Sequence, residues 1–179
     1  MRAYVGLQPP LATRQAIASD LAETSSAPQA AWVGQDHLHV TLRFLGDVPA
    51  GPSDFDALRA AYARTERREI QFGPALQRLG PDAVVVPVTG ADELAVIARA
   101  TADKAGDVVE LAQFFGHVTV ALPEVAEQRA WAQGVLGVSL RGSWLADDVC
   151  VFASEVVAGA KRYRVLARLP LAETSAREC

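Results

Sequence analysis

Two short stretches decide the fold of this chain: residues 37–48, HLHVTLRFLGDV, and residues 115–122, FGHVTVAL. Each contains a histidine that is followed two positions later by a threonine. In a β-strand, residues two apart project from the same face, and the residue between them points to the other face. Since apolar residues alternate around both motifs, each is predicted to be a strand with an apolar face and a face that carries a histidine and a hydroxyl.

The segments on either side of the two motifs predict a mixed α+β protein. Further strands are expected at residues 2–8, 69–79, 83–88, 136–144, 147–157 and 161–169, beside the motif strands at 38–45 and 115–122. Helices are expected from Pro10, from a cap at Ser53, over 91–105, and from Pro123 to about Gln133. A turn at Gly80-Pro81-Asp82 is expected to join 69–79 to 83–88 as a hairpin. Each half of the chain therefore contains helices, one His-x-Thr strand and a following hairpin.

Composition and charge narrow the class of protein. The chain has 179 residues, of which half are hydrophobic, and a net charge of −4. This length fits a single domain, residues 1–179, built as two lobes on a shared core. The negative charge argues against coating of long nucleic acid, so an RNA partner would be held over a small part of its length. Because residues 2–8 form a predicted strand that ends at Pro9-Pro10, secretion and membrane insertion are not expected.

The two cysteines, Cys150 and Cys179, fit neither a metal-binding spacing nor a disulfide framework. A cytoplasmic location is the expectation, and a monomer is the default for a chain of this size.

Two lobes related by a pseudo-twofold axis would bring both His-x-Thr strands to one cleft. Displacement at phosphorus requires one group to take a proton from the attacking oxygen and another to give a proton to the leaving oxygen. Histidine serves either role near neutral pH, and threonine hydroxyls donate hydrogen bonds to the phosphate oxygens. His39 and His117 are therefore the predicted acid–base pair, with Thr41 and Thr119 as phosphate donors and no metal required. The spacing alone leaves acid and base interchangeable.

With these motifs in context, the chain resembles a known family: the bacterial 2′-5′ RNA ligase-like proteins, also called RNA 2′,3′-cyclic phosphodiesterases, of the two-histidine phosphoesterase superfamily. The similar segments are RAYVGLQPP (2–10), WV (32–33), HLHVTLRFLGDV (37–48), FGHVTVA (115–121), VFASEV (151–156), YRVL (163–166) and LPL (169–171). They extend over nearly the whole chain, and their combination is far more specific than one His-x-Thr-x motif.

The resemblance implies a bilobal, pseudo-twofold α+β fold in which antiparallel sheets line a central cleft and helices lie outside. It implies a hydrolase that opens a 2′,3′-cyclic phosphate at an RNA end to a 2′-phosphate, without metal or cofactor. By this resemblance His39 protonates the departing O3′, His117 activates water, and Thr41 and Thr119 hold the phosphate. The reverse reaction would be 2′-5′ RNA ligation without ATP. RNA ends, including tRNA fragments, and small cyclic nucleotides are the implied substrates.

The sequence departs from the family at two positions. The family commonly has Pro before the second histidine and Arg three residues after the second threonine, whereas this chain has Gly116 and Leu122. Glycine allows more backbone freedom than proline, so the approach to His117 is expected to be looser. Leu122 removes a cation that could contact substrate.

Three further residues are candidate substrate contacts. Arg43 follows Thr41 by two positions, so it is expected on the same face, where it would neutralise phosphate charge; the alternative is a solvated strand-end arginine. Phe115, like Trp32, is a candidate for stacking on a base, although an aromatic residue beside a strand is more often part of the core. Ser154 is a candidate hydrogen-bond donor near the second half-site, or a plain structural hydroxyl.

Three other functions compete with the two-histidine reaction. His37 and His39 could form a three-histidine zinc site with His117, although this leaves both threonines unexplained. A binder of RNA ends would need phosphate donors but not a matched acid and base. A phosphodiesterase of small cyclic nucleotides would use the same four side chains.

Overall fold

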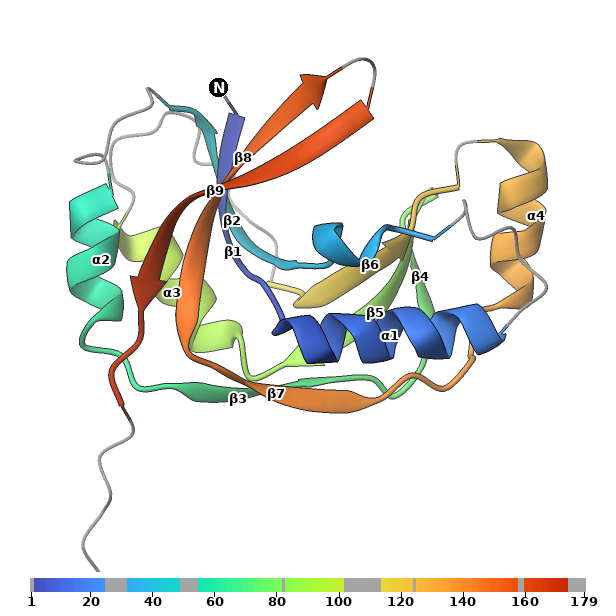
Figure 1. Cartoon of the computed structure of the whole chain (residues 1–179), viewed down its shortest axis with the longest axis horizontal. Helices are drawn as coiled ribbons and strands as arrows, with labels where there is room; N and C mark the ends of the chain where they lie inside the picture. The colour runs from blue at the N-terminus through green and yellow to red at the C-terminus, as the bar shows by residue number, and fades with distance from the viewer. Residues whose placement is uncertain are drawn as a thin grey trace, which may run out of the picture.

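The computed structural model describes residues 2–24, 32–48, 55–81, 83–101, 114–123, 125–157 and 160–173. The strands are β1 (Arg2–Leu7), β2 (Val40–Asp47), β3 (Arg68–Phe72), β4 (Gln77–Leu79), β5 (Ala83–Thr89), β6 (His117–Ala121), β7 (Gly142–Ala146), β8 (Asp148–Val157) and β9 (Ala160–Pro170). The helices are α1 (Leu11–Thr24), the 3₁₀ turn η2 (Gln35–His37), α2 (Asp56–Tyr62), α3 (Asp92–Thr101) and α4 (Ala126–Gly134) (Figure 1).

All named strands pair antiparallel in one curled sheet with the order β7-β3-β5-β6-β2-β1-β8-β9, and β4 pairs with β5. The two strands with the His-x-Thr motifs, β2 and β6, are the central neighbours and pair through Val40 and Val118. We call β2, β1, β8 and β9 the His39 half, and β6, β5, β3, β7 and β4 the His117 half. The predicted α+β fold, with antiparallel sheets around the two motifs and helices outside, is confirmed.

The two halves exchange strands, which the sequence did not predict. The strands that directly follow β2 in the chain, β3 to β5, pair in the His117 half. The last hairpin, β8–β9, pairs with β1 in the His39 half, so the red end of the chain lies beside the blue end in Figure 1. Each half of the sheet is therefore made from both halves of the sequence.

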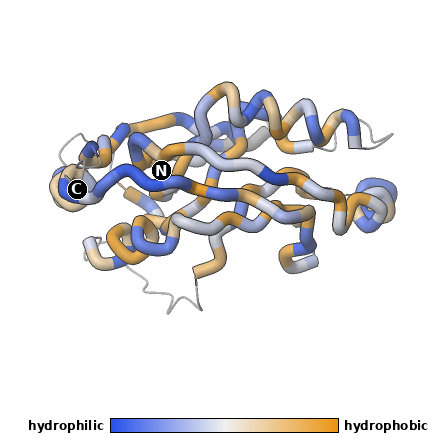
Figure 2. The backbone as a smooth tube through the Cα atoms, turned by 90° about the horizontal axis from the view of Figure 1, so that it is seen from below, coloured by the Kyte–Doolittle hydropathy of each residue, from blue (hydrophilic) through white to orange (hydrophobic). Residues whose placement is uncertain are grey.

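Apolar residues on one face of the His39 half pack against α2 and α3. Val5 and Leu42 are buried on the strands, and Leu94 and Ala98 are buried on α3. The Tyr62 hydroxyl at the end of α2 donates a hydrogen bond of 2.9 Å to the carbonyl of Leu94. Hydrophobic and hydrophilic residues alternate along the strands (Figure 2), as expected when one face of a strand is buried. This core holds the opposite face of the sheet in place for the two motifs.

Two predicted strands are longer than the strands in the structure. The predicted strand at 69–79 is two strands, β3 and β4, because Gly73 has φ 129° and Pro74 lacks the N–H that a ladder needs. The predicted strand at 136–144 begins only at Gly142, since the segment before it turns at Gly137, with φ 83°. The predicted cap at Ser53 and residues 102–105 of the third helix lie outside the described residues. In the described part of the chain, no helix has the length and apolarity needed to cross a membrane.

Candidate active site

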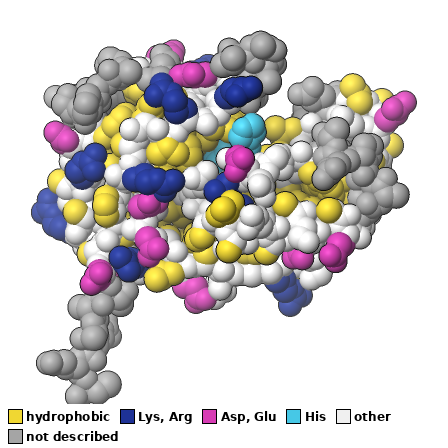
Figure 3. Space-filling view, viewed as in Figure 1, with side chains coloured by type: hydrophobic (Ala, Val, Ile, Leu, Met, Phe, Trp, Pro, Cys, Tyr) yellow, Lys and Arg dark blue, Asp and Glu magenta, His cyan; other side chains and the backbone are white. Residues whose placement is uncertain are grey.

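The two motifs face each other across a single strand junction. Val40 pairs with Val118 in antiparallel register, and one further step in each direction sets His39 opposite Thr119 and Thr41 opposite His117. The four side chains are half-buried, whereas Val40 and Val118 are fully buried. Figure 3 shows histidine surface, in cyan, in a recess of the molecule. The pairing of Val40 with Val118 therefore places both His-Thr pairs together on one accessible face.

Both histidines make the same backbone hydrogen bond. Nδ1 of His39 lies 2.6 Å from the carbonyl oxygen of His37, and Nδ1 of His117 lies 2.8 Å from the carbonyl oxygen of Phe115. A carbonyl oxygen only accepts, so Nδ1 must carry the hydrogen in each ring. In the neutral form Nε2 is then the proton acceptor, and in the cationic form it is a donor. In both rings Nε2 is therefore the atom that can take up or give a proton.

Three aromatic rings surround His39. The centroid of its imidazole lies 4.9 Å from the ring of Tyr4, 5.1 Å from that of Tyr163 and 5.7 Å from that of Phe152. These residues come from β1, β8 and β9, so all the strands of the His39 half contribute to the surroundings of this histidine. Sequence reasoning missed the three aromatic residues, because the register of the last hairpin against β1 is a tertiary feature.

Burial is the largest influence on the pKa of His39. It lowers that pKa from the ordinary value of 6.5, because a cation loses its hydration in an apolar surrounding. The backbone hydrogen bond to His37 acts in the opposite direction, and the charges of His117 and His37 lower the pKa further.

Tyr4 lies against His39 and forms the base of this aromatic surrounding. It is 3% exposed and stacks on Phe152 with 4.9 Å between ring centroids. Burial raises the pKa of its phenol, so the ring stays neutral. Two residues along the strand, Gly6 allows close approach of β2, because a Cβ there would lie 2.6 Å from the carbonyl oxygen of Val40.

His117 has a more open surrounding. Phe115 stacks on it with ring centroids 5.6 Å apart and an interplanar angle of 22°, and 45% of Phe115 is exposed. An exposed ring beside the proposed base leaves Phe115 as a candidate for stacking on substrate. Between them, Gly116 lies so near β5 that a Cβ would be 2.8 Å from the carbonyl oxygen of Val88. Leu122, at the second departure from the family pattern, is 46% exposed.

Arg43 does not share the face of Thr41, so this expectation is wrong. β1 pairs Gly6 with Thr41 and Val5 with Arg43, which leaves one extra residue on β2 as a β-bulge. The bulge turns Arg43 to the side of α3, where its Nη1 donates to the carbonyl oxygens of Ala98 at 3.1 Å and Arg99 at 2.5 Å. A contact between Arg43 and substrate stays untested.

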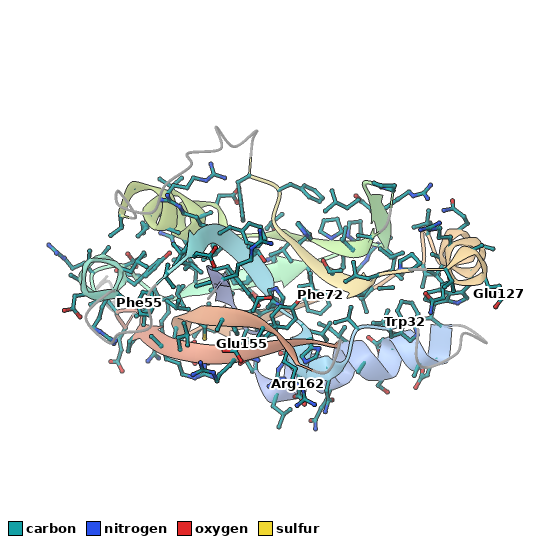
Figure 4. The ribbon with its side chains drawn as sticks, turned by 90° about the horizontal axis from the view of Figure 1, so that it is seen from above. Trp32, Phe55, Phe72, Glu127, Glu155 and Arg162 are labelled. Carbon is teal, nitrogen blue, oxygen red and sulfur yellow. The ribbon has the colours of Figure 1, made fainter. Side chains whose placement is uncertain are left out.

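Ser154 lies in the His39 half rather than near the second half-site. It is half-buried on β8, between Arg2 of β1 and Tyr163 of β9 in the register. The next pair along this hairpin, Glu155 and Arg162, is labelled in Figure 4. The difference arises because the closing hairpin pairs with β1, at the far side of β2 from β6.

Trp32 contacts both β6 and α4. It forms a bridge to Ala121 at the end of β6, and its ring meets Trp131 of α4 edge-on, with centroids 4.6 Å apart (Figure 4). It therefore connects β6 to α4, which is the more common core role that the sequence left open.

Within the described residues, no group of three His, Cys, Asp or Glu side chains is arranged to hold a metal ion. His37 instead meets the ring of Tyr163 edge-on at 5.2 Å. Cys150 is fully buried, and its pKa is raised to about 12, chiefly by burial, so its thiol is unsuited to be a nucleophile. At this face the two imidazoles fit acid–base chemistry and the two threonine hydroxyls fit hydrogen bonding to an anion.

The comparisons with known proteins agree with this geometry. The model of a family described as LigT like Phosphoesterase matches residues 5–80. The crystal structure of Escherichia coli LigT with 3′-AMP is 25% identical, with a TM-score of 0.73, over 96% of this chain and 98% of that chain. The chain is similar to this family in the sequence of residues 5–80 and to E. coli LigT in fold over nearly its whole length. The resemblance inferred from the two motifs is therefore confirmed.

Other solved structures give the same result. E. coli LigT with NADP⁺ is 25% identical, with a TM-score of 0.72, over 96% of this chain and 97% of that chain. The protein TT0787 of Thermus thermophilus is 21% identical, with a TM-score of 0.67, over 97% and 99% of the two chains, and shows the shared fold alone. No curated protein matches the sequence. The LigT-like sequence and fold support a phosphoesterase, an enzyme of the hydrolase class.

Proposed function

We propose that this LigT-like protein opens 2′,3′-cyclic phosphates at RNA ends to 2′-phosphates, without a metal ion or other cofactor. The observation that carries the proposal is the matched pair of imidazoles. Each has its Nδ1 hydrogen bonded to a backbone carbonyl, at 2.6 Å for His39 and 2.8 Å for His117, and each shares a strand face with a threonine. A protein that only binds phosphate would need the donors but not two imidazoles with the same free nitrogen.

In the proposed reaction, His117 Nε2 takes a proton from water as the water oxygen attacks phosphorus. The P–O3′ bond breaks, and His39 Nε2 gives a proton to O3′, which leaves a 3′-hydroxyl and a 2′-phosphate. Thr41 and Thr119 donate hydrogen bonds to the non-bridging oxygens, where negative charge is stabilised. Since each histidine lies opposite the other strand's threonine, the phosphate has a donor from both strands and a proton-transfer group on either side.

The low pKa of His39 adds a condition to this assignment. In the free protein its burial favours the neutral imidazole at neutral pH. A bound phosphate anion favours the imidazolium instead, so substrate itself would supply the charge that keeps His39 protonated. We therefore propose that His39 becomes a competent acid only after the cyclic phosphate is bound.

The crystal structures of E. coli LigT in complex with 3′-AMP, NADP⁺ and ATP support a nucleotide ligand. For this chain we propose RNA ends, including those of tRNA fragments, and small 2′,3′-cyclic nucleotides as substrates. The reverse of the same reaction would join a cyclic phosphate to a 5′-hydroxyl as a 2′-5′ linkage without ATP.

The test is hydrolysis of a short RNA that ends in a 2′,3′-cyclic phosphate, with EDTA present throughout. We expect a product that resists a 3′-specific phosphatase, as a 2′-phosphate does, and no inhibition by EDTA. His39→Ala and His117→Ala are the inactive controls. Binding of the RNA without turnover would instead indicate a protein that only binds RNA ends, and loss of activity with EDTA would indicate a metal enzyme.

A further inference from the structure

The residues that lead into His117 contact the end of α3. The guanidinium carbon of Arg99 lies 5.7 Å from the centroid of the Phe114 ring. That ring fills the space beside Gly116, where a Cβ would lie 3.3 Å from its nearest carbon. Phe115, which follows, accepts the Nδ1 hydrogen of His117. A residue on α3 therefore contacts the backbone segment that orients the second histidine.

Arg99 is suited to hold this ring. It is half-buried, and its Nε is buried with no hydrogen-bond partner among the described residues. A guanidinium that is partly removed from water interacts more strongly with an aromatic face. The Phe114 ring therefore makes a cation–π contact with Arg99, and this contact joins α3 to the segment just before β6.

Arg43 in turn fixes the end of α3. Its Nη1 donates to the carbonyl oxygens of Ala98, at 3.1 Å, and Arg99, at 2.5 Å, in the last turn of the helix. Carbonyl groups in the last turn of a helix have no hydrogen-bond donor within that helix, and a cation beside them also complements the helix dipole. Because Arg43 follows Thr41 by two residues, contacts run from the first half-site through α3 to the segment before the second.

We propose that Arg99 is a positioning residue for His117, which it orients through the ring of Phe114, and that Arg43 sets the position of Arg99. Glycine at 116 gives the segment 114–116 more freedom than a residue with a side chain would have. The packing of Phe114 under Arg99 restricts that freedom. Arg99 acts through Phe114 and does not touch substrate. Only the catalytic consequence of this inference rests on the proposed function.

The experiment uses a reporter that does not depend on activity. The amide of Val88 donates a hydrogen bond of 2.8 Å to the carbonyl oxygen of Gly116, whereas the amide of Val33 donates one of 2.8 Å to Val120 at the other end of β6. Hydrogen exchange at Val88, relative to Val33, therefore reports on the segment before His117. The variants are Arg99→Met, which keeps the length but removes the charge, and Arg99→Lys, which keeps the charge. Arg64→Met, an exposed position after α2, is the matched control.

We expect Arg99→Met to exchange at Val88 about tenfold faster than the unchanged protein, with Val33 unaffected, and Arg99→Lys to restore most of the protection. With a 2′,3′-cyclic nucleotide, kcat should fall by about tenfold in Arg99→Met while KM changes by less than about twofold, because a misplaced base affects the chemical step. Arg64→Met should alter neither measurement.

Unchanged exchange at Val88 in Arg99→Met would overturn the proposal. Equal acceleration at Val88 and Val33 would also overturn it, because that result means a general loss of stability. If the unchanged protein has no turnover, the proposed function fails, but the exchange measurement still decides whether Arg99 holds this segment.

Discussion

The two half-sites share one backbone design but have different surroundings. In each, a fully buried valine separates a histidine from a threonine, and Nδ1 of the histidine bonds to the carbonyl oxygen two residues earlier. Around His39 stand the rings of Tyr4, Phe152 and Tyr163. His117 has the half-exposed ring of Phe115 on one side. The short motif thus specifies which ring nitrogen bonds to the backbone, whereas the packing around the two rings differs.

Two copies of one short motif can therefore have different chemical surroundings. A reaction with an acid and a base requires two groups that differ in protonation state at the same pH. Burial under three aromatic rings lowers the pKa of His39 and so favours its neutral form in the free protein, and the acid role proposed for it therefore depends on a bound phosphate.

The largest effect is expected when either imidazole is removed. His39→Ala and His117→Ala should each lower kcat for a 2′,3′-cyclic phosphate substrate by about 10²- to 10⁴-fold, the usual contribution of a general acid or base. Circular dichroism should show that both variants remain folded, since each side chain is only half-buried. Near-normal turnover in one variant would remove that histidine from the mechanism and leave the half-sites unequal in function.

The threonines should be the next most sensitive positions. Thr41→Val and Thr119→Val keep the shape of the side chain but remove the hydroxyl, and each should reduce kcat by about 10²- to 10³-fold if it stabilises charge on the phosphate oxygens. Serine at either position keeps the donor and is the matched control. Steady-state kinetics of the four variants would show whether the two strands contribute equally, and a normal rate in either valine variant would contradict this role.

Each half-site also depends on a glycine that lets a neighbouring strand come near. A Cβ at Gly6 would lie 2.6 Å from the carbonyl oxygen of Val40, and one at Gly116 would lie 2.8 Å from that of Val88. Alanine at either position should lower the free energy of unfolding by about 1–3 kcal/mol, as overpacking does. Gly34→Ala is the control, because no atom lies within 4 Å of a Cβ there. Denaturant unfolding curves measure the three changes, and equal stability in all of them would contradict the close approach.

The smallest expected effect is on the pH dependence of stability. Because the pKa of His39 is lowered in the folded protein, the unfolded chain binds a proton first, and the free energy of unfolding should fall as pH decreases below about 6.5. His39→Gln removes this contribution and should lose less stability between neutral and mildly acidic pH. His117→Gln is measured alongside. An equal gain in acid tolerance from both variants would show that the two half-sites do not differ as described.

Much of the site could be predicted from local sequence. The alternation of apolar residues around His39 and His117 correctly predicted two strands with histidine and threonine on one face, because period-two burial is a local property. The proposed stacking of Phe115 on substrate stays a prediction, and its stacking on His117 is a finding of the structure. Arg43 could not be placed in this way, since a β-bulge between it and Thr41 shifts the alternation by one residue. No feature of the sequence around position 42 predicts that bulge.

By itself, the sequence determined the two His-x-Thr motifs from which the four catalytic residues are predicted, the antiparallel α+β class and the resemblance to the LigT-like proteins, since all of these depend on short-range patterns. Tertiary structure alone decided that Val40 meets Val118, which unites the two motifs. It also decided that β8–β9 pairs beside β1 and so brings Phe152 and Tyr163 to His39. The physical reason is that strand partners are selected by burial across the whole sheet, so residues more than a hundred positions away in the sequence surround this imidazole.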